Sequence, residues 1–320
     1  MSRPIARFAW AVLAFNLGVI VWGSVVRATG SGAGCGNHWP LCNGQVLPRA
    51  PEIETLIEFS HRATSGLALV LVAALAARAF KTTAPGHPAR RAALASLALI
   101  LTEAAVGAGL VLFELVADDR SMARALFMGV HLVNTFFLLA ALALTAHLLD
   151  GAPAPRLWGA GRRALPLLLA LAALLLVGSS GAIAALGDTL FPSRSLAEAL
   201  AQDLSTTSHV LIRLRVLHPS LAMLFALGLF AITAPLAAEA RTPAIGRWAR
   251  WALGLVVAQS FAGFLNVTLL APVWLQVVHL LLADLLWISL VLLTASVLAV
   301  GERSEAGAAP DAEPAPAAAR

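Results

Sequence analysis

Four histidines of this 320-residue chain are spaced so that they could bind a metal in pairs. They lie at or within two turns of the start of the second, fourth, sixth and eighth long apolar stretches, and they are His61, His131, His218 and His279. If the stretches cross a membrane in alternating directions, all four begin on one face and the imidazoles lie at similar depth. Because a neutral imidazole on the inner face of a helix bundle is an effective iron ligand, the spacing predicts paired iron ligands near that face.

The elements that position these histidines are predicted to be transmembrane helices. Hydrophobic residues make up 59% of the chain, charged residues 12%, and the mean hydropathy is +0.84. A soluble domain is about half apolar and about a quarter charged. Eight apolar stretches are long enough to cross a hydrocarbon layer of roughly 30 Å, and they span 8–28, 61–80, 92–116, 125–148, 165–187, 209–237, 249–270 and 274–299. The expected fold class is therefore an all-α polytopic membrane protein, with the first stretch retained as a span and not cleaved as a signal peptide.

Basic residues predict the orientation in the lipid bilayer. They gather before the first stretch and in alternate connections, at Arg3, Arg7, Arg78, Lys81, Arg90, Arg91, Arg156, Arg162, Arg163, Arg241, Arg247 and Arg250. Because such residues favour the cytoplasmic side, both termini are expected in the cytoplasm of a multi-pass protein of the cell membrane. The outer side then carries the loops 29–60 and 188–208. The net charge of +5 reflects this topology and does not indicate nucleic-acid binding.

An internal repeat of four helices is also predicted. The third and seventh stretches share a polar residue followed four positions later by a glycine, at an offset of 156 residues: Glu103 with Gly107, and Gln259 with Gly263. Because four spans return the chain to its starting side, the two copies have the same orientation, related by an axis along the membrane normal. Glycines at 23, 107, 109, 178, 181 and 263 are interpreted as packing residues that let helices approach closely.

Three regions follow from this repeat. The N-terminal half (1–150) and the C-terminal half (151–300) are each expected to form a four-helix bundle, while the tail 301–320, rich in Ala, Pro and Glu, is expected to be disordered. Each bundle then owns one histidine pair, His61 with His131 and His218 with His279. The alternative is that a histidine is only hydrogen-bonded within the core, but four at matched depth favour a functional role.

The remaining four histidines give weaker signals. His87 and His147 are expected to be solvated on the cytoplasmic side, and His38 lies in the outer loop. The role of His209, which opens the sixth stretch, stays open.

Haem fits these pairs better than zinc or non-haem iron. A porphyrin needs two axial ligands across an apolar slot, and its propionates need cations near the membrane surface. Arginines suited to carboxylates precede or follow the histidines on the outer side, namely Arg27, Arg62, Arg213 and Arg215. The alternative for each arginine is a side chain that extends to the membrane interface without a ligand.

Glu58 makes the two halves different. It precedes His61 by three residues and so shares its helix face, whereas Arg215 stands at the corresponding place before His218. A carboxylate beside a cofactor can accept a proton or stabilise positive charge, which favours chemistry in the N-terminal half and a permanent electron carrier in the C-terminal half. The alternative is an acid stabilised by the helix N-terminus.

Both cysteines lie in the outer loop, as Cys35 and Cys42. Outside the cytoplasm, a pair separated by six residues can close a disulfide, and no other pairing exists in this chain. Two roles stay open, a structural link within a glycine-rich loop and a redox pair that exchanges electrons or thiols with a partner.

Taken together, the motifs resemble the haem A synthase family over about residues 8–299. They are the run Gly23-Ser-Val-Val-Arg27-Ala-Thr-Gly30-Ser-Gly32, Cys35 with Trp39-Pro-Leu-Cys42, Glu58-x-x-His61-Arg62, Phe191-Pro192, His209, Arg213-Leu-Arg215, His218-Pro219 and His279. Two features depart from the family pattern. The loop reads Cys-Gly-Asn-His-Trp-Pro in place of the commoner Cys-Pro-Asp-Trp-Pro, and Glu103 stands where a glutamine is expected, which suggests that it modulates the polarity around the substrate haem.

The resemblance implies an oxidoreductase that oxidises the C8 methyl group of haem O to a formyl group, giving haem A for terminal oxidases. It implies that His61 and His131 bind the substrate haem, that Glu58 is the catalytic carboxylate, and that His218 and His279 hold haem b as an electron-carrying cofactor. Cys35 and Cys42 match the family's disulfide. The reaction is expected to proceed by two hydroxylations of one carbon followed by loss of water.

Two other classes of protein would explain part of the sequence. A di-haem electron-transfer subunit like the membrane cytochromes b needs the four histidines but not a reactive Glu58. A repeat-built transporter needs the parallel halves but no haem. The expected partners of the enzyme are haem O and the haem O synthase that supplies it; a homo-oligomer and a thiol-disulfide or electron-transfer partner stay open, and no nucleic acid is expected.

Overall fold

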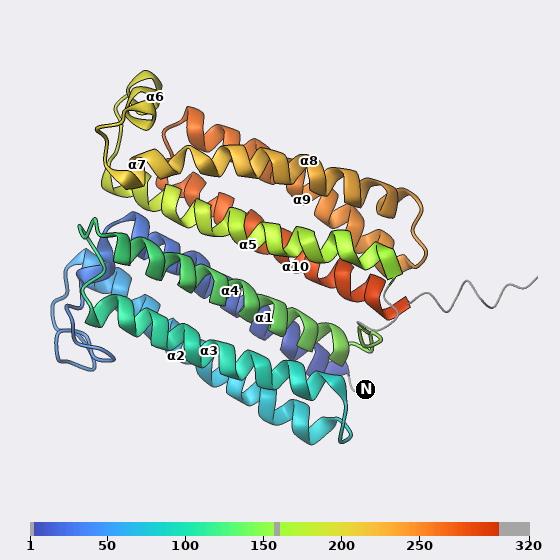
Figure 1. Cartoon of the computed structure of the whole chain (residues 1–320). Helices are drawn as coiled ribbons and strands as arrows, with labels where there is room; N and C mark the ends of the chain where they lie inside the picture. The colour runs from blue at the N-terminus through green and yellow to red at the C-terminus, as the bar shows by residue number, and fades with distance from the viewer. Residues whose placement is uncertain (1–2, 157–160, 301–320) are drawn as a thin grey trace, which may run out of the picture.

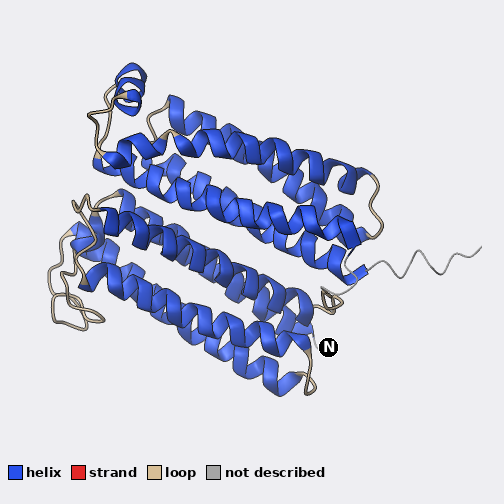
Figure 2. Cartoon of the chain, viewed as in Figure 1, coloured by secondary structure: helices blue, strands red, loops and turns tan. Residues whose placement is uncertain are grey.

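The structure is a computed structural model that describes residues 3–156 and 161–300. Within these ranges the chain is helical and contains no strand (Figure 2). The elements are α1 (Arg3–Ala28), η1 (Ser31–Ala33), α2 (Ile53–Thr82), α3 (Pro88–Leu112), α4 (Met122–Leu149), α5 (Gly161–Leu190), α6 (Leu196–Leu204), α7 (Val210–Arg215), α8 (Leu217–Ala238), α9 (Pro243–Thr268) and α10 (Val273–Val300). The predicted disordered tail, 301–320, lies outside the described residues.

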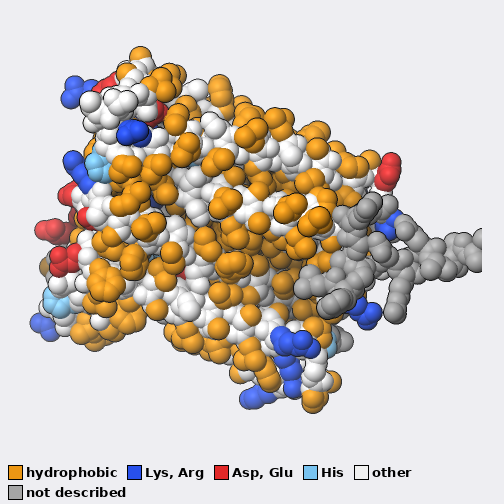
Figure 3. All heavy atoms as spheres, in the orientation of Figure 1, with side chains coloured by type: hydrophobic (Ala, Val, Ile, Leu, Met, Phe, Trp, Pro, Cys, Tyr) orange, Lys and Arg blue, Asp and Glu red, His pale blue; other side chains and the backbone are white. Residues whose placement is uncertain are grey.

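Within the described residues, eight segments are long and apolar enough to cross a membrane, as predicted, and one of them, Val210–Ala238, comprises α7 and α8. Apolar side chains cover the middle of the molecular face drawn in Figure 3, whereas charged side chains gather toward its two ends. Such a band matches the hydrocarbon layer, in which exposed polar groups are costly. The chain is therefore a multi-pass membrane protein. The cytoplasmic location of its termini stays a prediction.

The long helices pack in two groups that follow the order of the chain (Figure 1). In the N-terminal half α1 contacts α2 and α4, and α3 packs between α2 and α4; in the C-terminal half α8 lies against α5 and α9, and α10 against α9 and α5. The groups meet where α4 contacts α5 and α10, and where α1 contacts α10. That the groups are two copies of one repeat, with boundaries at 150 and 300, stays a prediction.

Side chains from the two halves interlock where these groups meet. Trp287 of α10 stacks on Phe136 of α4 with ring centroids 4.9 Å apart, and its indole N–H donates to the Phe136 carbonyl at 2.5 Å. Both side chains are almost fully buried, at 3% and 0% exposure. A large aromatic pair with a satisfied N–H is well suited to hold two helices in a lipid environment.

The outer connections differ from the predicted loops in two places. The first loop ends at residue 52 and not at 60, because α2 already begins at Ile53 with the polar turns that carry Glu54 and Glu58. The second, predicted as 188–208, contains α6, a short helix whose N-terminus is capped by Ser195. Because α2 begins at Ile53, His61 lies two turns inside this helix and not at its start.

The sixth span is interrupted just before its histidine. α7 ends at Arg215, α8 begins at Leu217, and Pro219 follows. Because proline has no N–H, it cannot donate to the carbonyl of Arg215 four residues earlier, which explains the break at Val216. Arg213, Arg215 and His218 nevertheless lie in one candidate span, Val210–Ala238, with a one-residue irregularity at Val216.

Candidate functional site

The histidine pair of the C-terminal half is directly visible in the packing of α8 and α10. The rings of His218 and His279 lie with centroids 6.2 Å apart and planes at 87°. Because metal–nitrogen bonds are about 2.0–2.1 Å, this separation is close to what two imidazoles need on opposite sides of one metal ion.

Groups of α5 fix the ring of His218. Its Nδ1 lies 3.2 Å from the carbonyl oxygen of Val177 and 3.2 Å from the hydroxyl of Ser180. A donor bond from Nδ1–H to a backbone carbonyl selects the tautomer whose Nε2 is free to bind a metal. The neighbourhood of this histidine thus fits an axial ligand.

The pair of the N-terminal half joins α2 and α4. His61 and His131 are close enough for electrostatic interaction. Oε1 of Glu103, on α3, lies 3.2 Å from Nδ1 of His131. Nδ1 of His61 is buried without a hydrogen-bond partner among the described residues.

In the C-terminal half the third helix also touches the second histidine, but with a different side chain and at the other ring nitrogen. Nε2 of Gln259, on α9, lies 3.3 Å from Nε2 of His279. The positions paired by the sequence offset, Glu103 and Gln259, therefore both touch the second histidine of their half. One is an acid and the other an amide.

Glycines make room for three of the four imidazoles. A Cβ added at Gly23 of α1 would lie 2.9 Å from Cε1 of His61, one at Gly181 of α5 would lie 2.9 Å from Cε1 of His218, and one at Gly263 of α9 would lie 3.1 Å from Cε1 of His279. The interpretation of these glycines as general packing residues was too broad, because they create the space that the histidine rings occupy. Gly107 differs, since nothing lies within 4 Å of its Cβ position.

These features fit a haem better than a metal bound by protein alone. In 3–156 and 161–300 no group of three or more His, Cys, Asp or Glu side chains could hold a metal ion. A haem needs only two protein ligands because its porphyrin supplies the others. Two imidazoles at bonding separation, with small residues against their rings, meet that need.

The predicted propionate arginines of the N-terminal half already have partners. Arg27 reaches across to the C-terminal half, where it donates to the Ala185 carbonyl, the Thr189 hydroxyl and the Gln276 side chain, each at 2.8 Å. Arg62 donates to the carbonyls of His38 and Leu41 in the outer loop, at 2.7 and 2.6 Å, and to Glu58. Arg27 thus ties the two halves, and Arg62 ties the loop to α2.

The two arginines of the C-terminal half differ in exposure. Arg215 is buried and forms ion pairs with Asp203, at 2.5 Å, and with Asp188, at 3.1 Å. Arg213 is exposed. Of the four predicted arginines, Arg213 is therefore the one that is exposed and has no ion pair within the described residues. A propionate role for any of the four stays a prediction.

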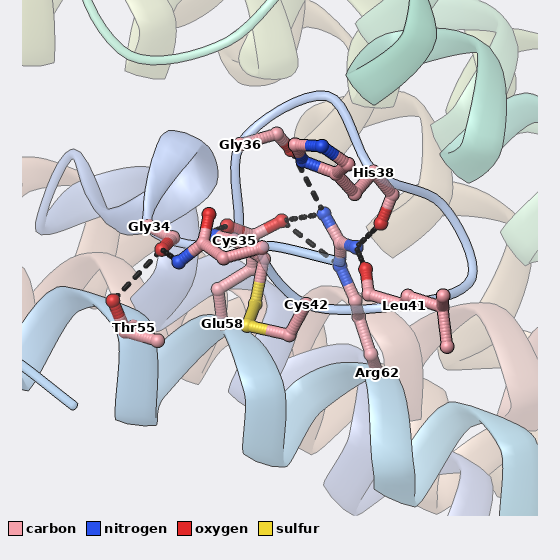
Figure 4. A network of polar contacts seen from close by, with 10 residues as sticks. Gly34, Cys35, Gly36, His38, Leu41, Cys42, Thr55, Glu58 and Arg62 are labelled. Atoms are coloured by element: carbon pink, nitrogen blue, oxygen red, sulfur yellow. Dashed lines mark hydrogen bonds and ion pairs between the residues drawn. A yellow bond between two sulfur atoms is a disulfide. The ribbon is translucent and has the colours of Figure 1, made fainter. Parts of the chain in front are cut away.

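Glu58 lies beneath the outer loop (Figure 4). The side chain is 3% exposed, Oε2 accepts the backbone N–H of Cys35 at 2.7 Å, and Oε1 accepts from Arg62 Nε at 3.0 Å and Nη2 at 2.5 Å. No hydrogen bond joins Glu58 to His61 in the part of the chain that the structure describes. Its carboxylate is therefore oriented by the loop and by Arg62.

The loop itself is closed by the predicted disulfide between Cys35 and Cys42. It docks on α2 through Gly34, whose carbonyl accepts the Thr55 hydroxyl at 2.8 Å. A Cβ at Gly34 would lie 2.6 Å from the backbone of Glu54, so only glycine allows this approach. The disulfide therefore holds the segment that contacts Glu58.

The other histidines have structural contacts. His87 and His209 cap the N-termini of α3 and α7 by accepting a backbone N–H. His147 packs edge-on against Trp248, and it is 8% exposed. The expectation that His147 is solvated was wrong, because α9 covers this end of α4.

Sequence reasoning missed Asp284 in the middle of α10. Its side chain is 0% exposed, and neither carboxylate oxygen has a hydrogen-bond partner within the described residues. It lies one turn before Trp287 and so shares the helix face that meets α4. A lone acid inside an apolar span is itself a signal for function, which would have drawn notice to it.

Comparison with known proteins identifies the family. The cytochrome oxidase assembly protein family COX15-CtaA matches residues 6–291. A Thermus thermophilus protein named protoheme IX farnesyltransferase is 52% identical over 301 residues, which are 93% of this chain and 49% of that protein.

Shorter matches connect the chain to proteins named Heme A synthase. The one from Staphylococcus haemolyticus is 39% identical over 126 residues, 39% of each chain, and the one from Exiguobacterium sp. is 34% identical over 151 residues, 47% of this chain and 48% of that one. The aligned segments thus span about half, or less, of these relatives. Because the family match extends over nearly all of the transmembrane region, the chain belongs to the COX15-CtaA family of cytochrome oxidase assembly proteins.

Proposed function

We propose that this protein is a haem A synthase, an oxidoreductase that converts the C8 methyl group of haem O to a formyl group. The observation that carries the proposal is the pair of imidazoles at 6.2 Å in the C-terminal half, and in the N-terminal half His61 and His131 are close enough to interact electrostatically. Family membership and the relatives named Heme A synthase support the same chemistry.

His218 and His279 would hold haem b, and haem b would supply one-electron transfer. The residues around them have positioning roles. The Val177 carbonyl and the Ser180 hydroxyl fix the ring of His218, and Gly181 leaves space for it. These contacts all come from α5, which would orient one ligand of the resident cofactor.

His61 and His131 would bind the substrate haem, and Glu58 would act on a proton released during the oxidation. A carboxylate offers about four acceptor positions, and the three donor contacts from Cys35 and Arg62 leave one of them. Glu58 is thus an oriented carboxylate with one position for a proton.

The Thermus relative supports a partner that supplies haem O. This chain aligns with about half of a protein whose name is protoheme IX farnesyltransferase, so that protein joins a segment like this one to a further segment of similar length. A haem O synthase bound to this chain would deliver its farnesylated product directly. Copurification of the two proteins from the membrane of a cell that expresses both tests this partnership; separate elution in mild detergent contradicts it.

The proposed role of Glu58 is tested in cells that make haem O but have no other source of haem A. Glu58→Ala is expected to lower haem A formation by roughly 10²–10⁴-fold, the usual contribution of a general acid or base, and to accumulate haem O or a hydroxylated intermediate. Mass analysis of the extracted pigments gives the result. Glu54→Ala is the matched control, since Glu54 is an exposed acid one turn earlier on α2.

A di-haem electron-transfer subunit is the second candidate. The observation that favours it is the commitment of Glu58 to Arg62 and to the loop, with no bond to His61 among the described residues. This candidate predicts that wild type leaves haem O unchanged while binding haem in both halves. Appearance of haem A in the extracted pigments of wild type excludes it.

A further inference from the structure

The short helix α6 carries an apolar face, although none of its residues is buried. Leu196, Leu200 and Leu204 are spaced by four and so lie on one side of the helix, with exposed fractions of 38%, 49% and 77%. Glu198 is two residues from Leu200, which places it about 200° around the helix axis, on the opposite side. The three leucines therefore form an apolar face that the described part of the chain leaves uncovered.

The side of α6 between these two faces holds the helix to the bundle. Asp203 forms an ion pair with Arg215 at 2.5 Å, and the Ala199 carbonyl accepts from the same guanidinium at 3.4 Å. Because successive residues are about 100° apart around the axis, Ala199 and Asp203 lie between the leucine face and Glu198. α6 thus meets the bundle along one side, with the leucines on one flank of that side and the exposed acid on the other.

α6 lies close to the level at which its flanking spans end. It is joined to the candidate spans that end at Leu190 and begin at Val210 by the connections 191–195 and 205–209. A connection of this length reaches at most roughly 18 Å. Arg215 places α6 closer still, because it lies inside the second span and forms an ion pair with α6. Figure 1 shows α6 beside α7, at the end of the bundle that also carries the disulfide-closed loop.

The surroundings of α6 fit the boundary between lipid hydrocarbon and headgroups. In the adjoining span Val210, Leu217 and Leu221 expose apolar side chains, as the lipid-facing side of a span does. Arg194, next to the N-cap Ser195, is exposed and has no ion pair within the described residues. Lipid phosphates attract such a cation. A helix with one apolar and one polar face is stable in this boundary, because it buries the first and hydrates the second.

We propose that α6 is an interfacial helix whose apolar face, Leu196, Leu200 and Leu204, lies in the headgroup region of the bilayer. Its partner is the lipid surface at the end of the bundle that carries the disulfide-closed loop. This contact holds Asp203 beside the buried Arg215, so the lipid surface helps to keep that arginine neutralised. Bound haem is not needed for the contact, which depends only on the apolar face and its level in the membrane.

The test uses single spin labels on purified protein in vesicles of phosphatidylethanolamine and phosphatidylglycerol. Because the two cysteines of the chain form the Cys35–Cys42 disulfide, a label reacts only with an introduced cysteine. The ratio of collisions with lipid-soluble oxygen to collisions with a water-soluble nickel complex is expected to be several-fold higher for Leu200→Cys than for the matched control Glu198→Cys. Leu204→Cys should give the same high ratio as Leu200→Cys.

Two results overturn the proposal. Equal ratios for Leu200→Cys and Glu198→Cys would place both faces of α6 in water. Shielding of Leu200→Cys from both oxygen and the nickel complex would mean that a second copy of the chain, and not lipid, covers the apolar face. Because neither measurement involves haem, such a failure leaves the proposed function untouched.

Discussion

The N-terminal and C-terminal halves surround their histidines alike but secure their outer ends differently. In each half a histidine of the second long helix packs on a glycine of the first, at Gly23 and Gly181. Between the histidines and the connecting loops, the N-terminal half has a disulfide-closed loop whose Cys35 N–H donates to Glu58. The C-terminal half instead has Arg215 bound to Asp203 of α6. The histidines thus have similar neighbours in both halves, whereas the ion pairs near them differ: Glu58 with Arg62 in one half, and Arg215 with Asp188 and Asp203 in the other.

This difference is consistent with the different tasks that the proposed function gives to the two halves. In the N-terminal half the acid is on the histidine helix, and the loop that covers it docks through Gly34. In the C-terminal half the acids are on α5 and α6, and they neutralise the arginine. Under the proposed function, Glu58 would be the reactive carboxylate near the substrate, and the ion pairs of Arg215 would lie near the permanent cofactor.

The largest expected effect is a loss of haem b, and it distinguishes the histidine pair of one half from that of the other. His279→Ala should remove the resident haem b completely, because one imidazole of the 6.2 Å pair is lost. His131→Ala should retain it. The absorption spectrum of protein purified from cells without haem O gives the answer. Loss of haem b in both variants would mean that the halves do not bind independently.

A second comparison uses the glycines opposite the imidazoles. Gly181→Val should strongly reduce haem b content, because even a Cβ would lie 2.9 Å from the ring of His218. The equivalent change Gly23→Val should spare haem b and abolish haem A formation. Gly107→Ala is the control, as its Cβ position is open. Unchanged haem b in Gly181→Val would contradict the role of this glycine.

The ion pairs of Arg215 with Asp188 and Asp203 in the C-terminal half provide a third comparison. Arg215→Ala leaves Asp188 and Asp203 without their cation, and we expect a loss of about 3 kcal/mol in unfolding free energy. Arg213→Ala removes an exposed guanidinium and should cost no more than about 0.5 kcal/mol. Thermal unfolding in detergent ranks the two. Equal losses would show that the ion pairs of Arg215 do not stabilise this half.

The smallest expected effect is the loss of stability in the loop that the Cys35–Cys42 disulfide closes. Cys35→Ser should destabilise the outer loop by about 2–3 kcal/mol, the chain-entropy value for so short a closed loop. Limited proteolysis should then cleave between residues 35 and 45 while the loop containing α6 stays as resistant as in wild type. Equal sensitivity of both loops to proteolysis would mean that the disulfide does not account for a difference in stability between them.

Much of the fold could be predicted because membrane helices are encoded locally. A run of apolar residues long enough to cross the hydrocarbon layer has few alternatives to a helix, so all eight spans were found. Helix ends were less accurate. Ile53 begins α2 well before its apolar run, since the first turns lie under the loop and tolerate Glu54 and Glu58.

The site was predictable in its residue types but not in its contacts. The periodic placement of His218 and His279 indicated a pair, whereas the bonds of Arg27 to α5 and α10 depend on how the two halves meet. Similarly, His147 is buried by α9, which its own sequence neighbourhood does not reveal. Contacts between residues that are far apart in the sequence determine the partners of Arg27 and the burial of His147, and a local sequence pattern does not contain this information.

The central claim is that each half binds one haem through its own histidine pair. The most direct test is the ratio of haem to protein in samples purified from cells with and without haem O. We predict a rise from one haem per chain to two when haem O is present, and no rise in His131→Ala. A ratio that stays at one in wild type would contradict the account.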